Sequence, residues 1–178
     1  MLYPLPAVLV SCAHDGRDNL LTVAWTGTVC SDPPMLFISV RPERFSYKLI
    51  KESGEFTVNL TTAAMARATD FCGVRSGADM DKWQATGLTR LQGVAVRCPA
   101  VAESPVSIEC KVRSVTPLGS HDMFVADVVN VIVDSSLTDP ATGRFQLEKA
   151  GLLNYSHGHY YCQGRPLGSF GFSVKKKK

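Results

Sequence analysis

Short runs of apolar residues, many of them alternating with polar ones and rich in valine, isoleucine and threonine, make up most of this chain. Clusters of glycine, proline and aspartate separate the runs, as in DGRDN at residues 15–19 and SDPP at 31–34. Runs of this kind, bounded by turn residues, predict antiparallel strands. The expected strands cover residues 7–13, 20–29, 35–41, 55–60, 106–115 and 123–133.

One segment between these strands has the signals of a helix instead. In residues 41–54, Pro42 suits the first helical turn, and Phe45 and Leu49 recur at the spacing of one helix face. Gly54 stands where a left-handed C-cap is expected. We therefore predict a helix over this segment.

Two further helices are expected, one over about residues 62–71 and a short one over 79–87. The pattern is weak over residues 87–105, which we interpret as irregular. The last twenty-five residues are rich in glycine and aromatic residues and poorly periodic, so they form either a loose lobe or a crossing to a partner subunit.

The length of 178 residues and the hydrophobic content of 45% suit one well-buried core and are short for two. We therefore expect a mainly β protein with a few α-helices, forming a single domain over residues 1–172. Residues 173–178 are expected to be a disordered, lysine-rich tail.

The formal net charge of +3 comes from 19 basic and 16 acidic residues, and the run 175–178 supplies four of the basic ones. Without that run, 15 basic residues face 16 acidic ones, a balance of −1. The lysine run could bind nucleic acid or anionic lipid, but a frayed, solvated end explains it more simply. We therefore expect neither nucleic acid nor a membrane as a partner.

Six cysteines occur without a CxxC pair or zinc-finger spacing, and several lie inside apolar runs such as VLVSCA and SIECKV. Such thiols act as small hydrophobic groups, and we expect them to be reduced. The N-terminal MLYPLPAVLVSC has no basic leader and only a short apolar run, so it predicts neither a signal peptide nor a membrane span. These features favour a cytoplasmic location.

Several familiar catalytic motifs are absent from the sequence: GxGxxG after a strand, GxxxxGK[ST], HExxH and GxSxG. A dinucleotide-binding fold, a nucleotide hydrolase, a zinc protease and an α/β-hydrolase are all disfavoured by their absence.

Two segments place cations and hydroxyls where they could bind an anion. Arg41 and Arg44 flank the expected start of the first helix, with Ser46 close by, and guanidinium groups beside free helix amides suit a phosphate. Ser76 and Lys82 follow in the SGADMDK segment and could reach the same anion. The alternatives are that the arginines are surface charges and that SGADMDK is an ordinary surface turn.

Trp25 lies among threonines in the run TVAWTGTVCSDPP, where the backbone could exchange hydrogen bonds with the edge of a flat heterocycle. The alternative is a core tryptophan, which is the more common role of a single tryptophan.

Taken together, five segments resemble the flavin reductase-like, FMN-binding split-barrel family, in its flavoredoxin-type branch. They are PAVLVSC, NLLTVAWTGTVCSDPP, ISVRPERFSYKLIKESGEFTVNL, DFCGVRSGADMDKW and GSHDMFVADVVNV, and the resemblance extends in unbroken order over roughly residues 5–172. It implies an FMN-binding split β-barrel that forms a homodimer, with FMN in a groove near the subunit interface.

The resemblance also implies a set of cofactor-binding residues. Backbone around the first tryptophan would face the flavin ring, arginines and hydroxyls would surround the phosphate, Asn59 would approach the ribityl chain, and Ser76 and Lys82 would close over the phosphate. The full set is Val23, Ala24, Trp25, Thr26, Thr28, Ser39, Val40, Arg41, Arg44, Ser46, Asn59, Ser76, Lys82 and His121.

Histidines are the remaining candidates for chemistry. His121 matches a histidine often found at this place in the family and could lie near the flavin or the entering nicotinamide; alternatively it bonds a neighbouring carboxylate such as Asp122. His157 and His159 would share one face if extended, with Cys162 close behind, but a third metal ligand is not evident and we expect no metal site.

Flavin chemistry needs little acid or base help from the protein, so we name no catalytic residue. The expected activity is electron transfer from NADH or NADPH through FMN to a flavin, a ferric complex or a redox protein. Two alternatives remain open: a flavoredoxin-type FMN electron carrier without efficient nicotinamide oxidation, and a non-redox binding module that has kept only the barrel.

Overall fold

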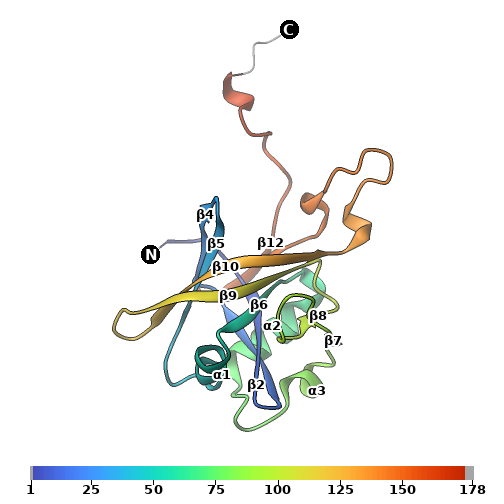
Figure 1. Ribbon diagram of the computed structural model, residues 1–178. Coiled ribbons are helices and arrows are strands. Elements are labelled where there is room, and N and C mark those ends of the chain that lie inside the picture. Colours follow the sequence, from blue (N-terminus) through green and yellow to red (C-terminus); the bar gives the residue numbers. More distant parts are fainter. Residues whose placement is uncertain (1, 175–178) are drawn as a thin grey trace.

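The computed structural model describes residues 2–174 (Figure 1). Its main feature is a seven-stranded sheet in which every neighbouring pair is antiparallel. In sheet order the strands are β3 (Arg17–Val23), β2 (Val8–His14), β6 (Glu55–Leu60), β9 (Val106–Pro117), β10 (Asp122–Val133), β5 (Pro34–Val40) and β4 (Thr26–Ser31). The predicted mainly β fold is confirmed.

The two outermost strands of this sheet, β3 and β4, are consecutive in sequence. Only Ala24 and Trp25 separate Val23 at the end of β3 from Thr26 at the start of β4. Three Cα–Cα steps span at most about 11 Å, so the sheet must roll until its edges nearly meet. The result is a β-barrel split along a seam between the two edge strands, since β3 and β4 do not pair with each other.

The single strand expected over residues 20–29 is therefore wrong. The chain stops pairing with β2 at Val23 and starts pairing with β5 at Thr26, where it has reached the opposite edge of the sheet. The other expected strands are confirmed with small shifts of their ends, and β6 has the predicted bounds.

Within residues 2–174, three α-helices accompany the sheet: α1 (Phe45–Ser53), α2 (Ala66–Val74) and α3 (Lys82–Thr86). Gly54 and Gly87 end α1 and α3 in the left-handed conformation, with φ of 67° and 71°, as expected for α1 from the sequence. Four 3₁₀ turns are η1 (Ala63–Met65), η2 (Ser135–Leu137), η3 (Leu147–Lys149) and η4 (Phe172–Val174).

Two small sheets were not expected. One pairs β1 (Leu5–Pro6) with β11 (Leu153–Ser156) and β12 (His159–Cys162), and the other pairs β7 (Arg90–Leu91) with β8 (Ala100–Val101). The remaining part of the 87–105 segment is irregular as predicted. Beyond Cys162 the chain leads away from the body to η4 (Figure 1).

The barrel has buried residues on both sides of β2 and β3. Val8 and Val10 point into the barrel core with Phe56 and Phe124, whereas Leu9 lies in a second cluster beneath α2 and α3. Because both faces are covered, most of β2 and the second half of β3 are mainly apolar rather than alternating. The other members of the second cluster are Leu20, Met65, Cys72, Trp83 and Val101.

All six cysteines are free thiols, four of them buried. Burial raises the pKa of Cys12, Cys98 and Cys110 to about 12, so these thiols are protonated structural groups.

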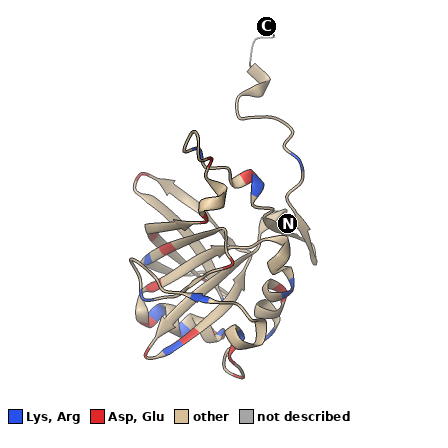
Figure 2. Ribbon diagram, turned by 90° about the vertical axis from the view of Figure 1, so that its right-hand side faces the viewer, with Lys and Arg blue, Asp and Glu red and all other residues tan. Residues whose placement is uncertain are grey.

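No helix within residues 2–174 is both long and apolar enough to cross a membrane. Lys and Arg are interspersed with Asp and Glu along the ribbon of the body (Figure 2), and the lysine run 175–178 lies outside the described residues.

Candidate functional site

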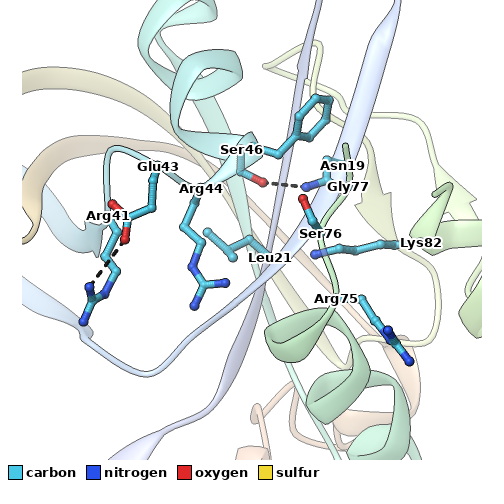
Figure 3. Close-up of a pocket in the computed structure, with 11 residues that line it drawn as sticks. Asn19, Leu21, Arg41, Glu43, Arg44, Ser46, Arg75, Ser76, Gly77 and Lys82 are labelled. Carbon is cyan, nitrogen blue, oxygen red and sulfur yellow. Dashed lines mark hydrogen bonds and ion pairs between the residues drawn. The ribbon is translucent and has the colours of Figure 1, made fainter. Parts of the chain in front are cut away.

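A polar pocket of about 460 Å³ lies beside the N-terminus of α1 (Figure 3). Four separate segments border it: β3, the turn leading into α1 with the first two residues of that helix, the loop that follows α2, and the first residue of α3. Its lining residues are Asn19, Leu21, Arg41, Glu43, Arg44, Phe45, Ser46, Arg75, Ser76, Gly77 and Lys82. Four of these residues are cations and one is an acid, which makes the pocket strongly basic.

Lys82 is the buried cation of this pocket, with 2% of its surface exposed. Its Nζ donates hydrogen bonds of 2.8 Å to the carbonyl oxygens of Leu20 and Cys72, which fixes the ammonium between β3 and α2. Burial lowers the pKa of Lys82. An ammonium carries three donors, so one N–H remains for a group in the pocket.

Arg44 is the second cation and occupies the N-cap position of α1 with extended backbone, φ −71° and ψ 136°. It forms no ion pair with any residue from 2 to 174, in contrast to Arg41, whose Nη1 lies 3.4 Å from Glu43 Oε1. No acidic residue occupies the first turn of α1, and its free amides and positive dipole end face the pocket. Glu43, just before the N-cap, lines the same pocket but is paired with Arg41. The Arg44 guanidinium is therefore available to an anion.

Asn19 and Gly77 shape the floor of the pocket. Asn19 is 2% exposed, and its Nδ2 donates a 2.8 Å hydrogen bond to Ser46 Oγ. A β-carbon at Gly77 would overlap the Asn19 amide, so only glycine lets the 75–77 loop approach this closely. Asn19 and Arg75 were not expected in the pocket from the sequence. The one signal for Asn19 is a polar residue beside the apolar end of β3.

A second, smaller pocket of about 180 Å³ opens along the seam of the barrel. It shares Leu21, Arg41 and Arg44 with the first, so the two pockets adjoin. The link between β3 and β4 forms one wall and the end of β5 the other. Its other lining residues are Thr22, Val23, Ala24, Trp25, Ser39, Val40 and His121.

Trp25 and His121 close one end of the seam pocket. Their ring centroids lie 4.5 Å apart, and Trp25 is 53% exposed, so the alternative of a core tryptophan is wrong for Trp25. Burial and the charge of Arg41 lower the pKa of His121, which favours its neutral form.

The alternative partner for His121 is also wrong. Its Nδ1 lies 2.9 Å from Ser120 Oγ, whereas the Asp122 carboxylate accepts a 2.6 Å hydrogen bond from the Tyr47 hydroxyl on α1. His121 therefore keeps its ring against Trp25, at the rim of the seam pocket.

The structure brings eleven of the fourteen expected residues to these pockets and leaves three outside their linings. Asn59 is fully buried: its Nδ2 donates to Leu9 O and Ser11 Oγ, and its Oδ1 accepts from Val101 N and Ser107 Oγ. The expectation that Asn59 reaches a ligand is therefore corrected, because its hydrogen-bonding groups are already engaged in the core.

Thr26 and Thr28 are the other two residues outside the pockets. Both lie on β4 beyond the seam, and the Thr26 hydroxyl donates a 2.6 Å hydrogen bond to the Phe37 carbonyl. Thr28 is exposed. Thr26 and Thr28 line neither pocket, and their placement in the cofactor site stays a prediction.

His157 and His159 do not share an extended face. His157 has a φ of 47° and lies with Gly158 in the tight turn between β11 and β12. Within residues 2–174, no group of three His, Cys, Asp or Glu side chains is arranged to hold a metal ion.

The rolled sheet and its open seam define the class of this protein as a split β-barrel. The chain belongs to the flavin reductase-like family: the family model described as "Flavin reductase like domain" matches residues 1–163.

Two solved structures and one curated protein are similar to this chain. Flavoredoxin of Desulfovibrio vulgaris (Miyazaki F) superposes with a TM-score of 0.90 and 31% identity over 98% of this chain and 95% of that chain. An FMN-binding protein from Thermus thermophilus, solved with bound 1-cyclohex-2-enone, gives a TM-score of 0.81 and 27% identity over 94% and 90%. An uncharacterized protein of Aeropyrum pernix is 31% identical over 87% of this chain. The matched region is only 58% of that protein's length.

Proposed function

We propose that this protein is an FMN-dependent oxidoreductase that passes electrons from NADH or NADPH through bound FMN to a flavin, ferric or protein acceptor. The observation that carries the proposal is the junction of a strongly basic pocket with a cleft walled by strand backbone. That pair of sites matches the two ends of FMN, a phosphate and a planar ring with hydrogen-bonding edges. The similarity to flavoredoxin and to an FMN-binding protein supports the same cofactor.

The residues present fit such a cofactor. Lys82 has one uncommitted N–H, Arg44 has an unpaired guanidinium, and the Ser46 and Ser76 hydroxyls border the same space. These groups would hold the phosphate, with α1 adding its free amides. Figure 3 shows that they come from different segments of the chain, which the fold brings to one pocket.

In the seam pocket the chain's contribution is positioning and shielding. Backbone from Thr22 to Trp25 lines the pocket, and its amides and carbonyls that are not already bonded, as the Trp25 carbonyl is to Ser39 N, could pair with the edge of a flat ring. Trp25 and His121 cover one end. When bound, FMN supplies the redox chemistry by accepting a hydride and holding its electrons. The protein therefore needs no general acid or base of its own, and we assign none.

The second candidate is a flavoredoxin-type carrier, which the 31% identity to a flavoredoxin favours. An absorbance spectrum of the freshly purified protein separates the two, when it is repeated after anaerobic addition of NADH or NADPH. Yellow protein that bleaches supports the reductase, and yellow protein that keeps its colour supports the carrier. Colourless protein that does not bind added FMN would support a non-redox binding module and overturn the proposal.

The phosphate site has its own test. We expect Arg44→Ala to weaken FMN binding by about 1.5–3 kcal/mol, the range for a charge-assisted hydrogen bond, measured by titration of flavin fluorescence. Lys51→Ala is the control because Lys51 is also on α1 but bonds the Tyr47 hydroxyl at 3.3 Å instead of lining either pocket. An unchanged FMN dissociation constant in Arg44→Ala would place the phosphate elsewhere.

We further propose that the protein is a cytoplasmic homodimer whose domain ends near residue 172. The pairing of β10 supports the dimer. β5 pairs only with Asp122–Asp127 of β10. From Val128 to Val133, β10 therefore pairs with β9 on one side and with no described strand on the other. Val129, Val131 and Val133 in that half are 40–49% exposed. An apolar strand with an open edge suits burial against a second copy.

A further inference from the structure

Residues 164–174, which we call the C-terminal arm, lead away from the body of the protein (Figure 1 and Figure 2). The root of the arm is tied to the body by a 2.9 Å hydrogen bond that Gln163 N donates to Leu152 O. Farther along, the apolar side chains of the arm face solvent: Leu167 is 92% exposed and Phe170 is fully exposed. The arm therefore offers apolar surface that its own body does not cover.

The composition of the arm differs from that of a solvated tail. Its eleven residues include only one charged residue, Arg165, beside four large apolar ones. Segments that remain solvated are typically rich in charge and poor in aromatic residues. Burial of the arm against another surface would remove this apolar area from water.

The end of the arm also has local structure of its own. A β-carbon at Gly168 would lie 2.7 Å from the Phe172 ring, so this ring packs directly against the Gly168 backbone. Phe172 N donates a 2.9 Å hydrogen bond to Ser169 O within the same turn. A segment that is ordered before it binds loses less conformational entropy on binding. The arm is therefore suited to docking as a preformed unit.

The arm projects from the same end of the molecule as a second apolar feature. β10 ends at Val133, and the chain continues from its open half into the 134–150 segment, which contains η2 and η3. In both views this segment and the arm extend beyond the same end of the sheet (Figure 1 and Figure 2). Phe145 in this segment is partly exposed, as are the valines of the open half of β10.

A second copy of the chain fits both features at once. Because the arm leads away from its own body, it leaves the open half of its own β10 uncovered. A two-fold axis at this end of the molecule would place the same apolar strand and the same arm of a second copy opposite. Each arm would then meet the body of the other copy.

We propose that two copies of this protein exchange their C-terminal arms, so that residues 164–174 of each copy pack against the body of the other. The inference rests on the homodimer proposed above and adds to it, because it makes the arm part of the interface along with β10. The strength of the dimer then depends on apolar residues more than thirty positions beyond that strand.

The first test measures the dimer dissociation constant of full-length proteins by sedimentation velocity over a dilution series. We expect the double variant Phe170→Ser, Phe172→Ser to raise this constant by about a hundredfold or more, since each dimer loses four buried aromatic rings. Val74→Ser is the control, because Val74 is 71% exposed but lies at the end of α2. Equal dissociation constants for the double variant and the control would overturn the inference.

The second test shows which chain the arm contacts. A photo-cross-linking amino acid, p-benzoylphenylalanine, replaces Phe172 in one full-length variant and Val94, in the 92–99 loop, in the control. After illumination, we expect the position-172 variant to give a band of twice the monomer mass on a denaturing gel and the control to give only the monomer.

The remaining outcomes contradict the inference in separate ways. A cross-link from position 172 to its own chain would show that the arm folds back on its own body, and a dimer without any cross-link would show that the arm stays in solvent. Both results would leave the homodimer intact. A wild type that is monomeric throughout the dilution series would reject the homodimer and the arm exchange together.

Discussion

At the residue scale, the anion pocket depends on small groups as much as on its cations. Asn19 and Gly77 carry no charge, yet they set the distance between β3 and the loop that bears Ser76. Asn19 in turn holds the Ser46 hydroxyl in place. The geometry of the hydroxyls therefore relies on the absence of one β-carbon.

We expect Gly77→Ala to weaken FMN binding about tenfold, equivalent to 1.4 kcal/mol, because the new methyl group displaces the buried Asn19 amide and with it Ser46. The unfolding free energy should also fall by about 1–3 kcal/mol, the usual cost of overpacking. Flavin titration and urea denaturation measure the two effects.

Gly164→Ala is the matched control, since a β-carbon there meets nothing within 4 Å. If both alanine variants bind FMN equally well, close packing at Gly77 has no part in the site.

Residue identities predicted much of the pocket but not all of it. Arg44, Ser46, Ser76 and Lys82 were expected from their residue types and motif positions, and the fold brings them together. Asn59 was misplaced because motif position does not reveal which buried polar groups already have partners. Whether a buried side chain has hydrogen-bond partners depends on residues distant in sequence, which for Asn59 include Leu9 and Val101.

At the element scale, the short helix α3 has an unusually clear start. The Asp81 carboxylate accepts hydrogen bonds from Trp83 N at 2.8 Å and Gln84 N at 3.2 Å. A helix of five residues cannot satisfy its own terminal amides. The cap therefore holds the element that carries Lys82 into the anion pocket.

We expect Asp81→Ala to lower the unfolding free energy by about 1 kcal/mol, the usual value of an N-cap. Asp81→Asn should restore most of this loss because an amide oxygen also caps. Asp79→Ala is the control, since Asp79 lies in the same loop and the N-cap of α3 is Asp81. Urea denaturation measures the unfolding free energy of each variant. Equal losses of unfolding free energy in the Asp79 and Asp81 alanine variants would show that the cap contributes nothing specific.

Elements with a strong period were predictable and elements defined by distant partners were not. The α1 helix and β6 follow directly from spacing and caps. The break at Ala24 and Trp25 was hidden because the run from Leu20 to Val29 contains no proline or charged residue to mark an end. Only the change of pairing partner from β2 to β5 ends the first strand. The β11–β12 hairpin was missed because its four-residue strands are mostly polar and aromatic.

At the scale of the whole molecule, the open edge of β10 determines the expected assembly. We expect Val131→Asp to convert the proposed dimer to a monomer, because a carboxylate on the apolar half-strand would be buried without a partner. Light scattering after size-exclusion chromatography gives the mass directly.

Val94→Asp serves as the control for assembly: Val94 is 76% exposed but lies in the 92–99 loop rather than on β10. A monomeric wild type, or a dimer that survives Val131→Asp, would contradict the proposed interface.

The two-residue link across the seam also determines how the fold responds to its surroundings. Val23 ends one edge strand of the sheet and Thr26 begins the other. Between them, the Trp25 carbonyl accepts a 2.9 Å hydrogen bond from Ser39 N on β5. Any small molecule lodged there touches both margins at once and binds only the rolled sheet. The unfolding free energy then rises with the logarithm of that molecule's concentration. The amount of folded protein in the cell would therefore depend on the supply of the molecule that binds in the seam.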